Sequence, residues 1–337
     1  MVALSERHAP PPKGSPDGNT AVHAAITRDI DEQAALLRGW NQTYDQISAG
    51  AFSGSFWEAR IDDVQFFREI TSNSLHQTGD LPEGTIAVGV PIALRGNARF
   101  CGQRCDGAQV HVFSGNDAFE FFSPSGLDIA GFVLREQDLR CSLTSDELET
   151  VLPSLANPHL RAVDGSAAEH MRRIFADVCE VVTNCPDLEN DAPRRASMTR
   201  DVRAALVAAL SRTENDSFDV PSAKRARIVR DARDLVTESP DGYTSVEELC
   251  RTLGVSRRAL QQSFQETLGL KPSAYLRSLR MNGARRAIKQ ANSVAEAATL
   301  WGFWHFGRFA RDYKVMFGEL PSEAFRRYHG PAEAGEP

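Results

Sequence analysis

Arginine and glutamine side chains share one face of a predicted helix near the carboxyl end of this 337-residue chain. Leu260 and Phe264 recur at helical spacing and predict a buried face for residues 257–267. The outward face carries Arg257, Arg258, Gln261 and Gln262. An arginine can form two parallel hydrogen bonds with guanine, and a glutamine can form two with adenine. The pattern therefore predicts a helix that reads base edges in double-stranded DNA.

The elements that must position this helix can also be predicted. Ser245 and Glu248 have the spacing of a capping box and mark the start of a preceding helix. Gly254 is expected to take the left-handed conformation that ends that helix, and Ser256 is expected to cap the basic one. Two helices joined by a tight turn form a helix-turn-helix, whose second helix enters the major groove.

The same arrangement occurs twice, because residues 245–276 align with residues 293–325. The matching positions are Ser245 with Ser293, Val246 with Val294, Glu248 with Glu296, Gly254 with Gly302, Phe264 with Tyr313, Gly269 with Gly318, Pro272 with Pro321 and Ser273 with Ser322. A single copy could be a generic helical hairpin. Two copies, each with a core pattern, a turn glycine and the same exit, favour DNA binding.

In the second copy, Gly302 is the predicted turn, and Phe309 and Tyr313 form the inner face of a helix over residues 305–315. The outward side of that helix carries His305, Gly307, Arg308 and Arg311. Gly307 has no side chain to read a base, but it lets the backbone approach DNA closely.

One helix over residues 277–291 is expected to join the two copies. Among its cations are Arg280, Arg285, Arg286 and Lys289. We interpret these, together with Lys314, as candidate phosphate contacts, which position a protein on DNA without selecting a sequence.

The charge of the chain is divided unevenly. The whole chain has a net charge of −7, yet residues 221–330 contain 19 basic and 11 acidic side chains and residues 1–220 contain 19 basic and 32 acidic ones. This asymmetry is typical of a basic module that meets a polyanion, attached to an acidic module that does not. Chance clustering on a solvated surface is the alternative.

The acidic part predicts a mixture of a helix, several strands and further helices. Apolar residues at helical spacing predict a helix over residues 21–49, and two longer helices are expected over residues 166–183 and 194–212. Short β-rich segments separated by turn signals lie at residues 52–61, 64–72, 85–94, 109–113, 118–122 and 127–134. They suggest a β-sandwich or barrel. The two long helices could pack on that barrel or pair with a second subunit.

The predicted fold class is therefore α+β, with a β-barrel and helices first and an all-α domain with two helix-turn-helix motifs second. The predicted segments are a disordered tail at 1–20, a first domain at 21–213, a linker at 214–221, a DNA-binding domain at 222–328 and a tail at 329–337. No apolar run is long enough to span a membrane, and the chain starts without a secretory signal, so we expect a cytoplasmic protein with reduced cysteines.

Residues 302–327, GFWHFGRFARDYKVMFGELPSEAFRR, resemble the signature of the AraC/XylS family of bacterial transcription regulators. The resemblance covers residues 222–327, with Tyr313 in place of the usual Phe and His305 where a Ser or Asp cap is usual. It implies that Arg258, Gln261 and Gln262 read bases from the first copy. It implies the same role for Phe306, Gly307, Arg308 and Arg311 in the second. The joining helix would hold the two reading helices about 34 Å apart, or one turn of DNA.

The first domain more weakly resembles the cupin-like sensing domains of this family. Residues 39–56, GWNQTYDQISAGAFSGSF, are similar to the start of that domain in regulators of amine and ethanolamine catabolism. The resemblance implies a homodimer that binds a small effector, with an amine or amino alcohol as one class, and activates a catabolic operon with RNA polymerase as a partner. A constitutive regulator whose first domain only dimerises is an alternative, and a cupin-type enzyme is another.

No catalytic residues, cofactor or metal site are expected. Cupin enzymes bind metal through a His-x-His pair, which this sequence lacks. His76 and His111 lie on predicted strands, with 34 residues between them. We interpret both as surface or hydrogen-bonded histidines rather than ligands. Cys101 and Cys105 have a spacing that a redox or metal site could use, but buried or idle thiols are the more common case.

Overall fold

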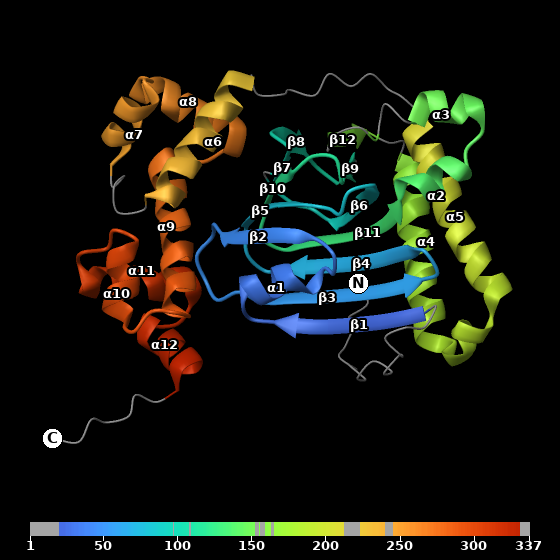
Figure 1. Ribbon diagram of the computed structural model, residues 1–337, viewed down its shortest axis with the longest axis horizontal. Coiled ribbons are helices and arrows are strands. Elements are labelled where there is room, and N and C mark those ends of the chain that lie inside the picture. The colour runs from blue at the N-terminus through green and yellow to red at the C-terminus, as the bar shows by residue number, and fades with distance from the viewer. Residues whose placement is uncertain are drawn as a thin grey trace.

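The computed structural model describes residues 20–96, 98–107, 109–151, 155, 159–162, 165–211, 223–239 and 245–330. The predicted tails and linker therefore lie largely or wholly outside the described residues. Within them, a part rich in strands runs from Thr20 to Ser211 and a helical part from Ala223 to His329. The α+β fold class is confirmed (Figure 1).

The strands form two antiparallel sheets. The large sheet has the order β1 (Thr20–Thr27), β3 (Gly54–Ile61), β4 (Val64–Thr71), β11 (Leu127–Arg135), β6 (Thr85–Ala93), β9 (Gln109–Ser114) and β12 (His159–Ala162). The small sheet has the order β2 (Asn41–Gln46), β5 (Leu75–Asp80), β10 (Phe119–Ser123), β7 (Ala98–Phe100) and β8 (Gln103–Cys105). All six predicted strands occur in these sheets.

The two sheets pack face to face and do not close into the barrel that the sequence suggested. In the described residues, no strand of one sheet pairs with a strand of the other. Aromatic side chains fill the space between the sheets, with Trp40 packed edge-on against Phe113 at a centroid separation of 5.2 Å and Phe100 against Phe113 at 4.9 Å. The physical reason is that most successive strands switch between the sheets, so each sheet presents an apolar face that the other covers.

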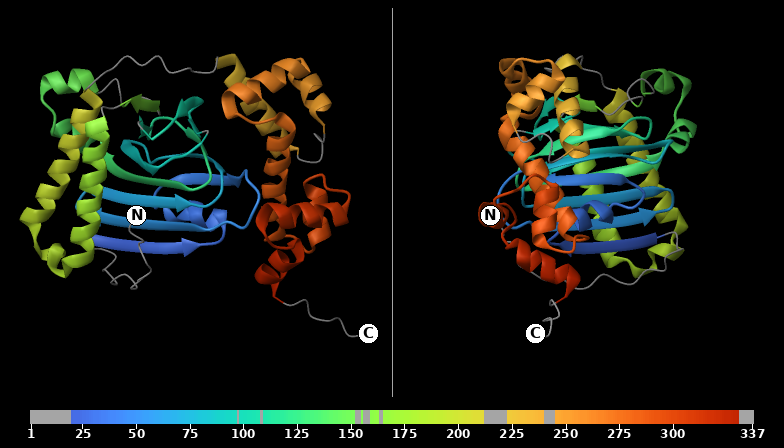
Figure 2. Two further views of the ribbon diagram at one scale, coloured as in Figure 1. Left: turned by 180° about the vertical axis from the view of Figure 1, so that it is seen from behind. Right: turned by 60° about the vertical axis from the view of Figure 1, so that its left-hand side comes forward.

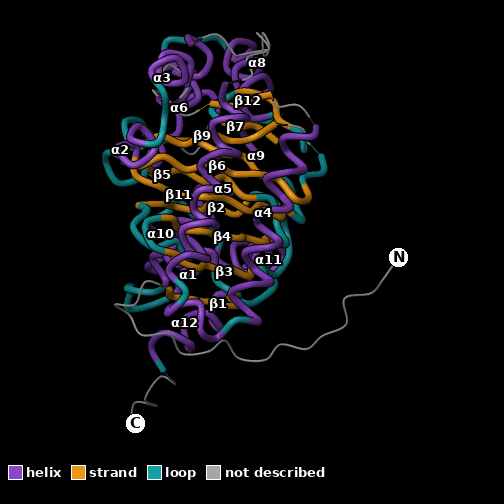
Figure 3. Tube along the Cα trace, turned by 90° about the vertical axis from the view of Figure 1, so that its right-hand side faces the viewer, coloured by secondary structure: helices purple, strands orange, loops and turns teal. Residues whose placement is uncertain are grey.

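Two long helices cover the outer face of the large sheet. These are α4 (Gly165–Asn184) and α5 (Ala192–Ser211), with the shorter α2 (Glu136–Cys141), α3 (Ser145–Val151) and η2 (Pro186–Asn190) beside them. Phe175 of α4 packs against Trp57 and Phe132 of the sheet at 5.6 Å and 6.3 Å. Of the two packing modes that the sequence left open, the structure shows packing within the chain (Figure 3).

The helix predicted over residues 21–49 is wrong. This segment forms β1, the short helix α1 (Ile30–Leu36) and β2 instead. Asp29 caps α1 by accepting hydrogen bonds from the backbone N–H groups of Asp31 and Glu32, so the helix cannot extend back through it. Ile26, expected on the apolar helix face, is 65% exposed on β1. Pairing of β1 with β3, a contact between residues far apart in sequence, overrides the local pattern.

The helical part contains α6 (Ala223–Glu238), α7 (Val246–Leu253), α8 (Arg257–Leu268), α9 (Pro272–Ile288), α10 (Val294–Leu300), α11 (Phe306–Phe317) and α12 (Pro321–His329). Its two cores meet on α9. Leu276 and Leu279 join the core of α6, α7 and α8, whereas Met281 and Ala284 join the core of α10, α11 and α12. Helix α9 is therefore a shared spine that fixes the two helix-turn-helix units relative to each other.

Helix α9 also lies along the small sheet, so the helical part and α4–α5 cover opposite sides of the strands (Figure 2). None of the helices in the described part of the chain has the length and apolarity that a bilayer crossing requires.

Candidate DNA interface

The first reading helix, α8, is fixed by the local signals that the sequence contains. Ser245 Oγ accepts from the Glu248 N–H at 3.2 Å, and the Glu248 carboxylate accepts from the Ser245 N–H at 3.0 Å, which completes the capping box of α7. Gly254 ends α7 with φ 63°, and Ser256 Oγ caps α8 by accepting from the Ala259 N–H at 3.1 Å. The helix-turn-helix geometry of this unit is confirmed.

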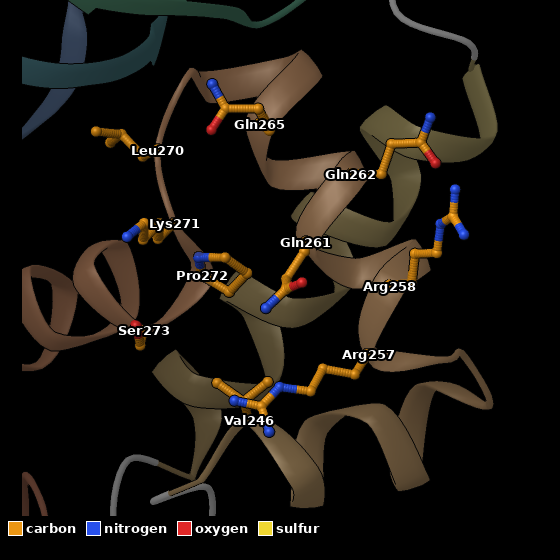
Figure 4. A pocket seen from close by; sticks show the side chains of 10 residues that line it. All are labelled: Val246, Arg257, Arg258, Gln261, Gln262, Gln265, Leu270, Lys271, Pro272 and Ser273. Carbon is orange, nitrogen blue, oxygen red and sulfur yellow. The ribbon is translucent and has the colours of Figure 1, made fainter.

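The outward face of α8 is polar and open to solvent. Its four predicted reading residues, Arg257, Arg258, Gln261 and Gln262, are all exposed. They border a hollow of about 510 Å³ together with Gln265 and the first residues of α9 (Figure 4). The hollow is open on its outer side, as a surface that receives a nucleic-acid strand must be.

The four side chains differ in how freely they can turn toward a base. Arg257 is paired with Glu247 at 2.9 Å, and Gln262 donates to Glu266 at 2.9 Å. Arg258 and Gln261 make no hydrogen bond or ion pair with another residue that the structure describes. Because both partners of the Arg257 pair are exposed, that pair is weak and exchangeable. Of the four side chains, Arg258 and Gln261 are therefore the two that can bind a base without first breaking an interaction with another described residue.

Lys271 and Ser273 also border the hollow, and the sequence reasoning did not single them out as contacts. Both are exposed at the start of α9, on either side of the buried Pro272. The signal that could have found them is the Gly-x-x-Pro exit of each repeat, which places these residues at a helix start where backbone N–H groups favour anions.

The second unit has the same geometry with a less well capped reading helix. Ser293 Oγ caps α10 by accepting from the Glu296 N–H at 3.1 Å, and Gly302 makes the turn with φ 73°. His305 occupies the cap position of α11 without a side-chain hydrogen bond to the helix. Phe309 and Tyr313 are buried as predicted. The departure from a Ser or Asp cap therefore costs α11 a hydrogen bond that α8 has.

The outward face of α11 combines cations with exposed aromatic rings. All five residues assigned to it are exposed: His305, Phe306, Gly307, Arg308 and Arg311. Phe306 is 48% exposed and the neighbouring Trp304, which the sequence reasoning missed, is 62% exposed. A side chain added at Gly307 would meet no atom of the protein within 4 Å, so internal packing does not require glycine there. Close approach to an external partner would require it.

The candidate phosphate contacts fall into two groups. Lys314 is exposed on α11, and Arg280 is half-buried with its guanidinium 5.8 Å from the centre of the Phe303 ring. Arg285, by contrast, is 4% exposed and its guanidinium lies 3.2 Å from Asp29. In this arrangement Arg285 faces the first domain, and we withdraw it as a phosphate contact.

Arg286 and Lys289 face the first domain as well. Arg286 pairs with Asp31 and Asp45, each at 2.9 Å, and Lys289 pairs with Asp31 at 2.6 Å. Burial disfavours the charged carboxylate of Asp29 and would raise its pKa. The positive charges of Arg285 and Lys289, together with a hydrogen bond from the Tyr328 hydroxyl, outweigh burial and lower that pKa to about 2. These cations of α9 therefore hold the two domains together. We call this set, Arg285, Arg286 and Lys289 with Asp29, Asp31 and Asp45, the α9 clamp.

Backbone contacts reinforce the α9 clamp. The Asn282 side-chain amide donates to the Gln46 carbonyl at 2.9 Å and its oxygen accepts from the Gln46 N–H at 3.0 Å. The Gly50 N–H lies 3.1 Å from the carbonyls of Val315 and Met316. A side chain at Gly318 would come within 2.7 Å of Ala51, so glycine is required for this approach. Residues 39–56 thus supply much of the surface on which the second unit rests.

The first unit meets the first domain through a buried histidine. His76 Nδ1 lies 3.0 Å from the Tyr275 hydroxyl, its Nε2 lies 2.8 Å from Glu120, and its ring stacks on Phe122 at 4.0 Å. This agrees with the prediction that His76 is a hydrogen-bonded histidine.

The other candidate sites have no support as reactive centres. His111 is fully buried between aromatic rings and neither ring nitrogen has a hydrogen-bond partner among the described residues, so the prediction of a surface or hydrogen-bonded histidine is wrong for this residue. Burial lowers its pKa to about 3, which keeps it neutral. Burial raises the pKa of Cys101 and of Cys105 to about 12, so both thiols stay protonated. Within the described ranges, no group of three or more ligand-type side chains could hold a metal ion.

The geometry defines a DNA-binding domain with two helix-turn-helix units. A family model described as a helix-turn-helix domain matches residues 249–327, from within α7 to within α12. The probable thc operon regulatory protein of Rhodococcus erythropolis is 42% identical over 103 residues, which are 29% of this chain and 31% of that protein. The XylDLEGF operon transcriptional activator 3 of Pseudomonas putida is 30% identical over 159 residues, which are 45% of this chain and 47% of that protein.

Among solved structures, the AraC-like transcriptional activator CuxR covers 83% of this chain and 100% of its own at 15% identity and a TM-score of 0.41. The chain spans about a third to a half of the length of the two curated relatives. Residues 249–327 therefore match a helix-turn-helix family, and the match includes residues 302–327, which carry the resemblance to the AraC/XylS transcription regulators.

Proposed function

We propose that the whole chain is a sequence-specific transcription regulator that binds promoter DNA as a cytoplasmic homodimer and responds to a small effector. One observation carries the proposal. Two helix-turn-helix units with exposed polar reading helices share α9 as a rigid spine, which presets their separation before DNA is bound (Figure 1). Preset spacing lowers the entropy cost of engaging two groove segments together.

Activation is the proposed direction of control. The Pseudomonas putida relatives are named as operon activators, and this chain is 30–38% identical to the matched parts of two of them. An activator that recruits RNA polymerase to a catabolic operon is consistent with those names. The relatives are regulators by name, which favours regulation over the alternative of a cupin-type enzyme.

The proposal is tested by selecting duplexes from a random-sequence library with the full chain. We expect enrichment of a site with two conserved blocks, and weak binding of unrelated duplexes that falls steeply with salt. Arg200→Ala, at an exposed position on α5, serves as the matched control and should select the same site. Recovery of no preferred sequence would overturn the proposal.

A constitutive regulator is the second candidate, because the space between the two sheets, where a sandwich could hold an effector, is packed with aromatic rings. It predicts that no small molecule changes the affinity for the selected site. The effector-responsive form predicts that at least one metabolite does.

A further inference from the structure

A second cavity, of about 650 Å³, lies between the two domains rather than inside either one. One wall comes from strands and loops of the small sheet, and the other comes from α6 and the end of α8. Its lining shares no residue with the hollow on the reading face of α8. The volume is within the range of sites that enclose small molecules.

The two walls carry opposite charges. Asp80, Asp117 and Glu120 line the side of the sheet, and Arg230 and Arg233 line the side of α6. Glu120 is already engaged by His76 at 2.8 Å and lies 3.8 Å from Arg233. Asp117 and Arg230 are exposed, and neither forms an ion pair with another described residue. Asp80 accepts a hydrogen bond from Asn41 but likewise forms no ion pair among the described residues. The cavity therefore offers two carboxylates, Asp80 and Asp117, and one cation, Arg230, that are free of ion pairs on facing walls.

A buried hydroxyl in the lining also lacks a partner. Thr267 of α8 is 2% exposed, and its Oγ1 makes no hydrogen bond to any described residue. A buried polar group without a partner destabilises the folded state, so native structures seldom leave one unsatisfied. The hydroxyl oxygen itself is closed to solvent in this conformation, so a ligand in the cavity would supply the missing partner once the hydroxyl turns toward it.

We propose that this interdomain cavity binds a small zwitterion, a molecule with one ammonium and one carboxylate such as an amino acid, and that this molecule is the effector. The ammonium faces Asp117, the carboxylate faces Arg230, and a polar atom of the ligand reaches Thr267. An apolar ligand would bury both charges unpaired, and a simple amine or carboxylate would satisfy one wall only. The inference rests on the proposed function, because it assigns the site of an effector-responsive regulator.

The location of the cavity gives the ligand a means of control. Both walls are present only while the domains are docked as the structure has them, so a ligand that needs both walls binds this arrangement preferentially. Preferential binding shifts the population toward it. Docking through the α9 clamp also positions the second helix-turn-helix unit, so the ligand and DNA are coupled, and each changes the affinity for the other by the same factor.

The test is calorimetric titration of the full chain with the standard L-amino acids, 4-aminobutyrate and 6-aminohexanoate, with hexylamine and hexanoate as single-charge controls. We expect at least one zwitterion to bind and both single-charge controls to fail. Arg230→Gln should weaken that binding by about tenfold or more, which is the loss of one ion pair. Arg227→Gln, at an exposed position on α6 outside the cavity lining, should not change it.

Thr267→Val separates ligand contact from folding. Because valine has nearly the same shape and Thr267 Oγ1 has no partner in the protein, this change should leave the unfolding temperature unchanged or slightly raised. It should nevertheless weaken binding of the zwitterion severalfold. If Thr267→Val binds the zwitterion with unaltered affinity, the hydroxyl does not contact the ligand. The inference is overturned if Arg230→Gln binds with unaltered affinity or if no zwitterion binds the wild-type chain.

Gel shifts on the selected DNA site, run without ligand, distinguish this inference from the proposed function. If the chain selects a DNA site but binds no zwitterion, only the effector assignment fails. If it binds a zwitterion but selects no DNA site, the proposed function fails. If Arg230→Gln keeps the wild-type affinity for DNA and loses the response to the zwitterion, both stand.

Discussion

The two helix-turn-helix units share a fold but differ in how they meet their surroundings. The first unit has side-chain caps on both helices and a reading face of arginines and glutamines. The second has an uncapped reading helix that presents a glycine, two arginines and an exposed phenylalanine. From this difference we propose that the first unit reads by directed hydrogen bonds, and that the second relies more on close backbone approach and apolar contact with thymine methyl groups.

The units also differ in their attachment to the first domain. The second unit is held by the α9 clamp and by backbone contacts to Gly50, whereas the first meets the small sheet at His76. We infer that the first unit carries most of the sequence choice and that the first domain acts mainly on the position of the second. The predictions below test this division of roles.

Breaking the α9 clamp should have the largest effect. Arg285→Ala leaves Asp29 buried with Lys289 and Tyr328 as its remaining side-chain partners, beside the two backbone N–H groups that it caps, and loss of one partner of a buried pair costs about 3–5 kcal/mol. We expect a loss near the lower end of that range, because two partners stay in place. Denaturant unfolding of the full chain measures it. Arg311→Ala, which is exposed, is the control, and equal stability of the two variants would contradict the clamp.

The stability of the first domain should be sensitive to pH through Glu69. Burial raises the pKa of Glu69 to about 7 from 4.5, although hydrogen bonds from Gln33 and Tyr44 oppose the rise. The folded chain therefore holds this proton more tightly than the unfolded chain. Its contribution to the free energy of unfolding is complete below pH 4.5, falls as the pH rises from 4.5 to 7, and is lost above.

Glu69→Gln, which resembles the protonated carboxyl, should be more stable than the wild type by about 3 kcal/mol at pH 8 and similar to it at pH 4.5. Unfolding curves at both values check this. A difference that is the same at both values would show that Glu69 does not titrate in this range.

Substitutions on the two reading helices, α8 and α11, should affect different blocks of the DNA site. Arg258→Ala should weaken binding to the selected site by roughly 1–3 kcal/mol and relax the choice of base in one block. Arg308→Ala should act on the other block, and more weakly if the second unit reads mainly through apolar contacts, because Arg308 already faces Asp312 at 3.7 Å. Gel shifts on sites changed in one block at a time measure this, and identical effects on the same block would break the comparison.

The smallest effects belong to the cations expected at phosphates. Lys314→Ala and Arg280→Ala should weaken binding to all sequences alike and lower the slope of affinity against salt by about one charge each. Arg280 should give the smaller change, because it is half-buried against Phe303. An altered choice of sequence in either variant would show a base contact instead.

The features that the sequence predicts well are local. Ser245, Gly254 and Ser256 act on backbone groups within four residues, so their roles follow from spacing alone. The two cores of the helical domain follow from helical periodicity for the same reason. The exposed reading residues occupy the helix positions that the apolar periodicity does not assign to the buried face.

The features that the sequence could not predict depend on distant partners. Arg285 pairs with Asp29 across 256 positions, and nothing near Arg285 in the sequence distinguishes a phosphate contact from an interdomain contact. Residues 20–27 form a strand only because β3 pairs with them. The zwitterion cavity has walls from both domains and exists only once they dock.

Hydroxyl-radical footprinting of the full chain on its selected site tests the central claim most directly. If α8 and α11 enter successive segments of the major groove, two protected patches should appear on one side of the duplex, about 10 base pairs apart. Arg258→Ala should weaken protection of one patch and Arg308→Ala that of the other. A single patch, or one that both substitutions affect equally, would contradict the account.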